Sequence, residues 1–242
     1  MKPFAFLECR LPCAIAEDEY QVLQRITRLG QSGLERIWLD SLAGEIDYSR
    51  YSGLIVSGSP FGYHTEQSAK SPAQIKIEAN IDSVVDYCLA ADYPYFGICY
   101  GLQAVAIHQR MPLTSEYPED IDAVQLMLTD QGKDDPIFSQ LPDEFYCVTG
   151  HNDALAEPLI TGVHLVRSET CPIQAVRFGK NVYGIQFHPE INHESLEIRL
   201  ATYAGKYFQI DAADRVRASV AKRDLSPSEM LLKTFVRRYQ KG

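Results

Sequence analysis

A cysteine set between two glycines is the first feature of the chain that suggests chemistry. Cys99 is the centre of Gly97-Ile-Cys-Tyr-Gly101 and directly follows the apolar run Tyr95 to Ile98. This G-x-C-x-G spacing is the cysteine counterpart of the G-x-S-x-G turn, which places a nucleophile between a strand and a helix. Glycines on both sides remove Cβ atoms that would crowd such a turn. Because a helix N-terminus stabilises a thiolate, the pattern predicts a cysteine nucleophile.

A thiolate nucleophile needs a base, which is normally an imidazole oriented by a third group. The segment Tyr183-Gly-Ile-Gln-Phe-His-Pro-Glu190 offers both, with His188 and Glu190 two residues apart. On an extended strand, residues i and i+2 face the same side, so we expect Glu190 to reach the His188 ring. Pro189 favours an extended backbone at His188.

An oxyanion hole would complete such a site. The segment Leu54-Ile-Val-Ser-Gly-Ser-Pro60 predicts a buried strand that runs into a loop of small residues. A backbone N–H of this loop could complement the N–H of Tyr100, which follows the nucleophile. On its own the loop would be read simply as a turn.

The surrounding elements must bring these three segments together. Helical periodicity covers Glu17 to Leu29 and Pro72 to Leu89, and it alternates with short apolar runs in the first half of the chain. The expected strands are Pro3 to Leu7, Leu34 to Leu39, Gly53 to Val56, Tyr95 to Ile98, Ala123 to Leu128, Phe145 to Val148, Val163 to Val166, Ile173 to Val176 and Val182 to Phe187. This order predicts an α/β fold whose parallel sheet has an antiparallel extension. Active sites of such sheets lie at the carboxyl ends of the strands.

The three motifs, in this order, resemble the class I glutamine amidotransferases, the group with a Cys-His-Glu triad. Three further stretches look like the amidotransferase domain of GMP synthetase: Asp134 to Phe145, Gly150-His-Asn-Asp153 and Phe187 to His193. The likeness extends over roughly Ser52 to Leu200. It implies a flavodoxin-like three-layer sandwich with a mostly parallel central sheet.

Carried over by position, the resemblance implies Cys99 as nucleophile, His188 as base and later acid, and Glu190 as the carboxylate that orients it. The backbone N–H groups of Ser59 and Tyr100 would form the oxyanion hole. Gly101 and Gln103 would line the glutamine pocket, and Gly58 is expected there as well. His151, in the loop Gly150-His-Asn-Asp153, could line the mouth of the site, and a polar turn is the alternative for this loop. Neither a metal nor an organic cofactor is expected.

The implied reaction is hydrolysis of the glutamine side-chain amide through a γ-glutamyl thioester, with release of glutamate and ammonia. The segment after the motifs is short, so the ammonia would pass to a separate synthetase subunit. Two alternatives stay open at this point. The same machinery could cleave small γ-glutamyl peptides or conjugates, or the chain could be a binding or regulatory module without turnover.

Composition limits the other classes of function. The formal net charge is -9, which disfavours binding to nucleic acid and to anionic membranes. Six cysteines are scattered, mostly within apolar runs, and neither a signal peptide nor a membrane span is apparent, so we expect a cytoplasmic protein with reduced thiols. We expect an amidotransferase-like domain over residues 1–205 and a helical extension over 206–242. In the extension, Ser226-Pro-Ser-Glu229 suggests a capping box before an amphipathic helix.

Overall fold

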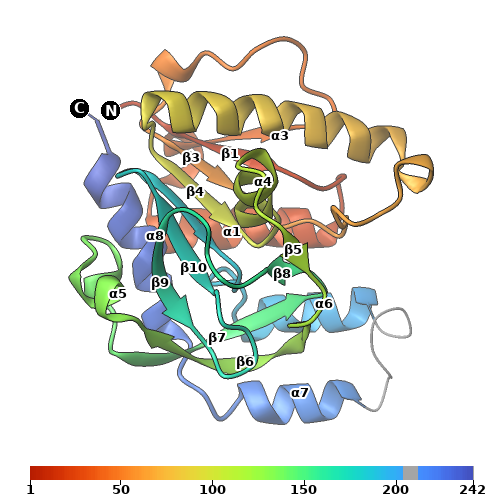
Figure 1. Ribbon diagram of the computed structural model, residues 1–242, viewed down its shortest axis with the longest axis vertical. Helices are drawn as coiled ribbons and strands as arrows, with labels where there is room; N and C mark the ends of the chain where they lie inside the picture. Colours follow the sequence, from red (N-terminus) through yellow and green to blue (C-terminus); the bar gives the residue numbers. More distant parts are fainter. Residues whose placement is uncertain (204–211, 242) are drawn as a thin grey trace.

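A nine-stranded sheet is the centre of the computed structural model, which describes residues 1–203 and 212–241. The first five strands in space pair in parallel, and the remaining four continue the sheet through antiparallel pairs (Figure 1). Their spatial order is β2 (Leu34–Trp38), β1 (Phe4–Glu8), β3 (Leu54–Val56), β4 (Tyr95–Ile98), β11 (Val182–Ile185), β10 (Ala175–Phe178), β9 (Val163–Arg167), β6 (Glu119–Leu128) and β7 (Glu144–His151). A second, two-stranded sheet pairs β5 (Leu113–Thr114) with β8 (Ala154–Leu155).

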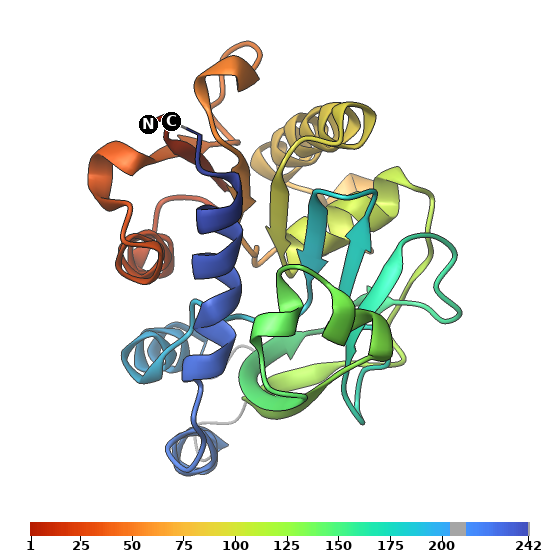
Figure 2. The same ribbon diagram turned by 90° about the vertical axis from the view of Figure 1, so that its left-hand side faces the viewer.

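Helices cover both faces of the parallel part of the sheet. One face carries α1 (Ala14–Thr27) and α8 (Ser226–Tyr239), and the other carries α3 (Pro72–Ala91) and α4 (Tyr100–His108), as Figure 2 shows. The remaining helices are α2 (Gly30–Gly33), α5 (Asp130–Asp134), α6 (His193–Tyr203), α7 (Ala212–Val220) and the 3-10 turns Tyr48–Arg50, Gln67–Ala69 and Phe138–Gln140. The three-layer α/β architecture expected from the sequence is therefore confirmed.

Strand β1 shows how the sequence divides the core into two layers. Phe4 and Phe6 point toward α1 and α8, whereas Ala5 and Leu7 point toward α3 and α4, and all four are fully buried. This is the two-residue period of a strand with apolar neighbours on both faces.

None of the helices in the described part of the chain has the length and apolar character needed to span a bilayer.

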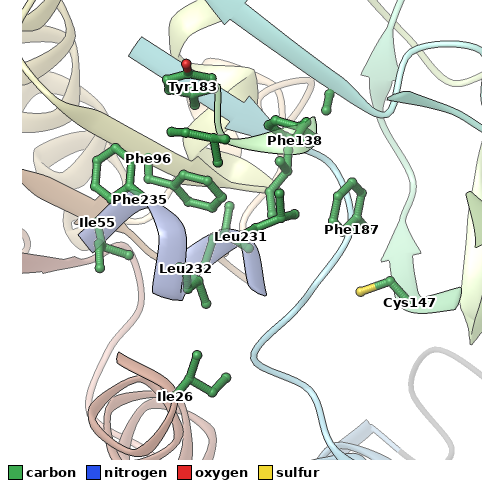
Figure 3. Close-up of a cluster of buried hydrophobic side chains, with 14 of the residues drawn as sticks. Ile26, Ile55, Phe96, Phe138, Cys147, Tyr183, Phe187, Leu231, Leu232 and Phe235 are labelled. Atoms are coloured by element: carbon green, nitrogen blue, oxygen red, sulfur yellow. The ribbon is translucent and has the colours of Figure 1, made fainter. Parts of the chain in front are cut away.

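Helix α8 belongs to the hydrophobic core. Leu231, Leu232 and Phe235 are fully buried, and the ring centroids of Phe235 and Phe96 are 5.2 Å apart (Figure 3). The centroid of the Phe235 ring is also 6.0 Å from that of Phe4. The ends of the chain also meet, because the Lys2 N–H donates to the carbonyl of Lys241 at 3.2 Å. The predicted terminal helix thus packs on its own domain.

Two local expectations differ from the structure. The helix α8 cap is Leu225 rather than Ser226, and no side chain caps it, because Ser226 already has a helical position. Strand β11 ends at Ile185, two residues before the predicted end at Phe187. The division of the chain at residues 205 and 206 lies outside the described residues, so it stays a prediction.

Candidate active site

Cys99 lies on a sharp turn between β4 and α4, at the carboxyl end of a parallel strand. Its backbone has φ 49° and ψ -93°, a combination that residues with a Cβ rarely adopt. Two backbone hydrogen bonds hold the turn: the Cys99 N–H donates to the carbonyl of Ile185 at 2.6 Å, and the Gln103 N–H donates to the carbonyl of Cys99 at 3.1 Å. The predicted arrangement of strand, sharp turn at Cys99 and helix is present.

The two glycines that flank the nucleophile are required by close packing. A Cβ on Gly97 would lie 2.6 Å from the backbone carbon of Gly101. A Cβ on Gly101 would lie 3.2 Å from the Cβ of Val56 in the neighbouring strand β3. Because real Cβ atoms do not approach backbone atoms to 2.6 Å, the turn is closed to any larger residue at position 97.

His188 and Glu190 form a buried hydrogen-bonded pair beside this turn. The His188 Nδ1 and the Glu190 Oε1 are 2.6 Å apart. The backbone N–H of His188 donates to the backbone carbonyl of Val148 at 2.8 Å. The two side chains meet as expected, but His188 and Glu190 do not lie together on the predicted extended strand. His188 makes a single bridge to β7, and the chain then turns, with the Ile191 N–H donating to the carbonyl of His188 at 3.1 Å.

In this pair, each charge shifts the pKa of the other group in the direction that favours its ionised form. Burial alone would lower the pKa of His188, but the carboxylate of Glu190 and the nearby Cys99 outweigh it and raise that pKa to about 10. Burial would raise the pKa of Glu190, yet the charge of His188 holds it below its usual value. Both shifts favour an imidazolium and a carboxylate at neutral pH.

A network of buried charges lies behind the triad carboxylate. Arg199 of α6 approaches Glu190 at 3.7 Å and pairs with Glu19 of α1 at 2.9 Å and with Asp18 at 3.0 Å. Glu19 also pairs with Arg10 at 2.8 Å. These residues were not predicted, because partners such as Arg199 and Glu19 are 180 positions apart in the sequence. They fix α6 and α1 around the site.

The loop after β3 is held by two serine side chains. The Ser57 hydroxyl accepts from the N–H of Cys9 at 2.8 Å and donates to the carbonyl of Gly58 at 2.8 Å, while the Ser59 hydroxyl donates to the carbonyl of Cys9 at 2.6 Å. The peptide between Gly58 and Ser59 is trans, so its N–H points away from the Ser57 hydroxyl. Within the described part of the chain, neither the Ser59 N–H nor the Tyr100 N–H has an acceptor.

Gly58 brings this loop into contact with the triad. A Cβ on Gly58 would lie 3.0 Å from the Cε1 of His188 and 3.8 Å from the Cβ of Cys99. Gly58 therefore leaves the space in which the His188 ring lies. This is a steric role beside the triad rather than a place in the cavity wall.

A cavity of about 380 Å³ opens above Cys99. Several of the predicted residues line it, namely Ser59, Cys99, Tyr100, Gln103 and His151, whereas the predicted pocket residues Gly58 and Gly101 do not. Tyr203 of α6 and three residues of α7, namely Ala212, Arg215 and Val216, also line it. Helix α7 lies within the helical extension expected over 206–242, but its contribution to the cavity was not expected.

His151 is anchored at the cavity wall by an acidic partner. Its Nε2 lies 2.9 Å from the Oε2 of Glu119, and this oxygen also accepts from Gln174 at 2.8 Å. The Oε1 of Glu119 accepts from the hydroxyl of Thr170. Burial would raise the pKa of Glu119, but the hydrogen bonds from His151 and Thr170 hold it below its usual value. The other ring nitrogen of His151 is buried and has no partner within the described residues.

Gln186 is a further residue that the sequence motifs did not single out. It is fully buried, and its side-chain amide donates to the Sγ of Cys99 at 3.2 Å. Its position in the same eight-residue segment as His188 and Glu190 was the available signal. No group of His, Cys, Asp and Glu side chains in the described residues is arranged to hold a metal ion.

The chain is similar in sequence and in fold to known proteins. The family model described as "Glutamine amidotransferase class-I" matches residues 18–201. The GMP synthase (glutamine-hydrolyzing) of Thermosipho africanus is 36% identical over 126 residues, which are 51% of this chain and 23% of that protein. One subunit of the GMP synthase (glutamine-hydrolyzing) of Thermoplasma volcanium is 26% identical over 179 residues, or 72% of this chain and 77% of that relative.

The chain spans less than a third of the full-length GMP synthases that it matches, with 23% of the protein of T. africanus and 30% of that of Thermosipho melanesiensis. Among solved structures, a glutamine amidotransferase from Thermotoga maritima has a TM-score of 0.79 with 16% identity, and each chain is covered over its full length. At this identity the match supports the fold alone.

Proposed function

The chain belongs to the class I glutamine amidotransferase family, and on this premise we propose that it hydrolyses the side-chain amide of glutamine through a covalent intermediate on Cys99. The observation that carries the proposal is the buried His188 and Glu190 pair beside Cys99, which lies on a sharp turn and lines the cavity. Relatives named GMP synthase (glutamine-hydrolyzing) support glutamine as the substrate.

The reaction begins when the Cys99 thiolate attacks the carboxamide carbon, forming a C–S bond and moving an electron pair to the amide oxygen. The N–H groups of Ser59 and Tyr100 stabilise this oxyanion. His188, held as an imidazolium by Glu190, gives its proton to the amide nitrogen, and ammonia leaves when the C–N bond breaks. Neutral His188 then takes a proton from water, which attacks the thioester and releases glutamate and the thiolate.

The cavity residues have separate tasks in this proposal. Gln103 and His151 line the wall beside Cys99 and would contact the amino-acid end of glutamine. Gly58 and Gly101 act indirectly, by leaving space for the His188 ring and for strand β3. No metal or organic cofactor has a part in these steps.

We further propose that the ammonia is consumed by a separate synthetase subunit. The relative from T. volcanium is named as one subunit of a GMP synthase, and the chain covers 77% of it. A solved structure from Thermoplasma acidophilum, named as a GMP synthase subunit, shares the fold at a TM-score of 0.60. Addition of the correct synthetase subunit would couple glutamine hydrolysis to amination of its substrate.

Glutamate release by the purified protein tests the proposed reaction. We expect glutamine to yield equal amounts of glutamate and ammonia, and Cys99→Ala to yield neither. The matched control is Cys13→Ala, which removes the exposed thiol at the start of α1 and should leave the activity unchanged. Equal inertness of the wild type and Cys99→Ala on glutamine and on γ-glutamyl peptides would instead support a binding module.

One observation favours a γ-glutamyl hydrolase as the second candidate. The cavity of about 380 Å³ extends to α7, where the exposed Arg215 lines it. A leaving group larger than ammonia, with a carboxylate, would fit this charge. Faster glutamate release from γ-glutamyl dipeptides than from glutamine, with a loss of that preference in Arg215→Gln, would establish this alternative.

A further inference from the structure

The amide of Gln186 makes a direct contact with the proposed nucleophile. Its Nε2 lies 3.2 Å from the Sγ of Cys99, and the side chain is fully buried. The backbone is fixed as well, because the Gln186 N–H donates to the carbonyl of Gln174 at 2.8 Å. The two residues in contact, Gln186 and Cys99, are 87 positions apart, so the contact depends on the fold.

The direction of this hydrogen bond follows from its neighbours. Gln103 donates through its Nε2 to the backbone carbonyl of Asp153 at 2.8 Å, and a carbonyl can only accept. The same NH₂ group of Gln103 points at the Oε1 of Gln186 in a long hydrogen bond of 3.5 Å. Because the Gln186 oxygen faces Gln103, its NH₂ group faces the sulfur. Asp153, Gln103 and Gln186 thus form a relay of amides that ends at Cys99.

We propose that this amide relay makes Gln186 a catalytic residue, which stabilises the Cys99 thiolate through a fixed N–H donor. The inference rests on the proposed function, since it assigns a role in the same reaction. An N–H group donates more strongly to a charged sulfur than to a thiol. The donor serves both halves of the reaction, because the thiolate is the attacking group in the first and the leaving group in the second.

Charged groups from several elements surround this contact. His188 and Glu190 follow β11, and Arg10 follows β1 and lies 3.6 Å from the position of a Gly58 Cβ. Asp153 joins the relay through its backbone carbonyl, while its carboxylate pairs with His64 at 2.9 Å. All of them are retained when Gln186 alone is replaced. A change in thiolate formation can therefore be assigned to the amide.

The test measures the rate at which iodoacetamide alkylates Cys99 as a function of pH, in a protein that need not turn over substrate. Gln186→Met removes the donor and keeps a similar length, and Gln186→Glu keeps the shape but presents an oxygen to the sulfur. We expect the rate profile to move to higher pH by about one unit in Gln186→Met, and further in Gln186→Glu. Gln103→Met removes the NH₂ group that orients the Gln186 amide but keeps the Gln186 donor. It should shift the rate profile in the same direction by a smaller amount.

The matched control is Gln125→Met on β6, whose amide donates to Glu144 at the surface, and its profile should equal that of the wild type. Glutamate release should fall about tenfold in Gln186→Met at neutral pH. An unchanged alkylation profile in both folded Gln186 variants would overturn the inference, even if glutamate release fell, because the side chain would then act by packing alone. If the protein releases no glutamate at all, the alkylation profiles still decide the role of Gln186 separately from the proposed function.

Discussion

Glu190 sets the charge of His188, and this can be tested by removing one negative charge. In Glu190→Gln the carboxylate that raises the pKa of His188 to about 10 is lost, so burial should bring this pKa down. Glutamate release should decrease about 100-fold or more, and its alkaline limit should move to lower pH. NMR titration of the His188 ring in the wild type and the variant measures the change directly. An unchanged titration midpoint would show that Glu190 only orients the ring.

A substitution at Gly58 tests whether the space around the His188 ring is needed for catalysis. In Gly58→Ala the new Cβ would approach the His188 Cε1 to 3.0 Å, so the ring must shift. We expect the rate of glutamate release to fall by about 10- to 100-fold, with a small loss of stability. Gly33→Ala is the control, because its Cβ would meet Leu29 at the same 3.0 Å on α2, outside the site. Equal rates in the two variants would exclude the proposed role of Gly58.

At the scale of elements, the loop after β3 is expected to present a formed oxyanion hole. In Ser57→Ala the hydrogen bond to the carbonyl of Gly58 is lost, so the peptide that carries the Ser59 N–H can rotate. Glutamate release should decrease about tenfold or more, while alkylation of Cys99 by iodoacetamide keeps its rate. The comparison of these two rates checks the prediction. A parallel loss of both rates would mean that the serine supports the nucleophile instead.

Helix α8 should contribute much of the stability of the sheet on which the site is built. Phe235→Ala removes a fully buried ring that packs on Phe4 and Phe96, and we expect it to lower the free energy of unfolding by about 3–5 kcal/mol. Arg237→Ala, at an exposed position of the same helix, should change it by less than about 0.5 kcal/mol. Urea denaturation measures both. A similar small effect of the two substitutions would mean that α8 is only loosely attached.

Elements with a regular pattern could be predicted, and elements that depend on distant partners could not. The alternation of apolar strands and periodic helices indicated β1, β4, α1 and α3, since burial of both sheet faces demands it. Helix α7 lies within the helical extension expected over 206–242, but it was not singled out, because it has only nine residues and buries just Ala213 and Val220. The site followed the same rule. Cys99 and His188 stand in local motifs, whereas Gln186 and Arg199 matter only through contacts across the fold.

On the scale of the whole molecule, a buried carboxyl should make stability depend on pH. Glu8 is fully buried at the end of β1, and burial, reinforced by the charge of Glu19, raises its pKa to about 8. The folded state therefore holds a proton that the unfolded chain releases near its ordinary pKa of 4.5. Stability from this group is complete at acidic pH and is lost as the pH rises through about 8.

Glu8→Gln tests this linkage because it keeps a neutral side chain at every pH. Compared with the variant, the wild type should lose on the order of a few kcal/mol of unfolding free energy between about pH 5 and pH 8. Denaturation curves at several pH values measure the difference. If the difference in unfolding free energy between the wild type and the variant is constant across this range, Glu8 ionises normally in the folded state, where it pairs with Arg36 at 3.7 Å.

Covalent labelling tests most directly whether Cys99 attacks a γ-glutamyl carbon. The purified protein would be treated with a chloroketone analogue of glutamine and digested, and the modified peptide would be identified by mass spectrometry. We expect one adduct, on Cys99, whose formation is slowed by free glutamine. The absence of an adduct on Cys99, or labelling of the exposed Cys13 at an equal rate with no protection by glutamine, would contradict the proposed nucleophile.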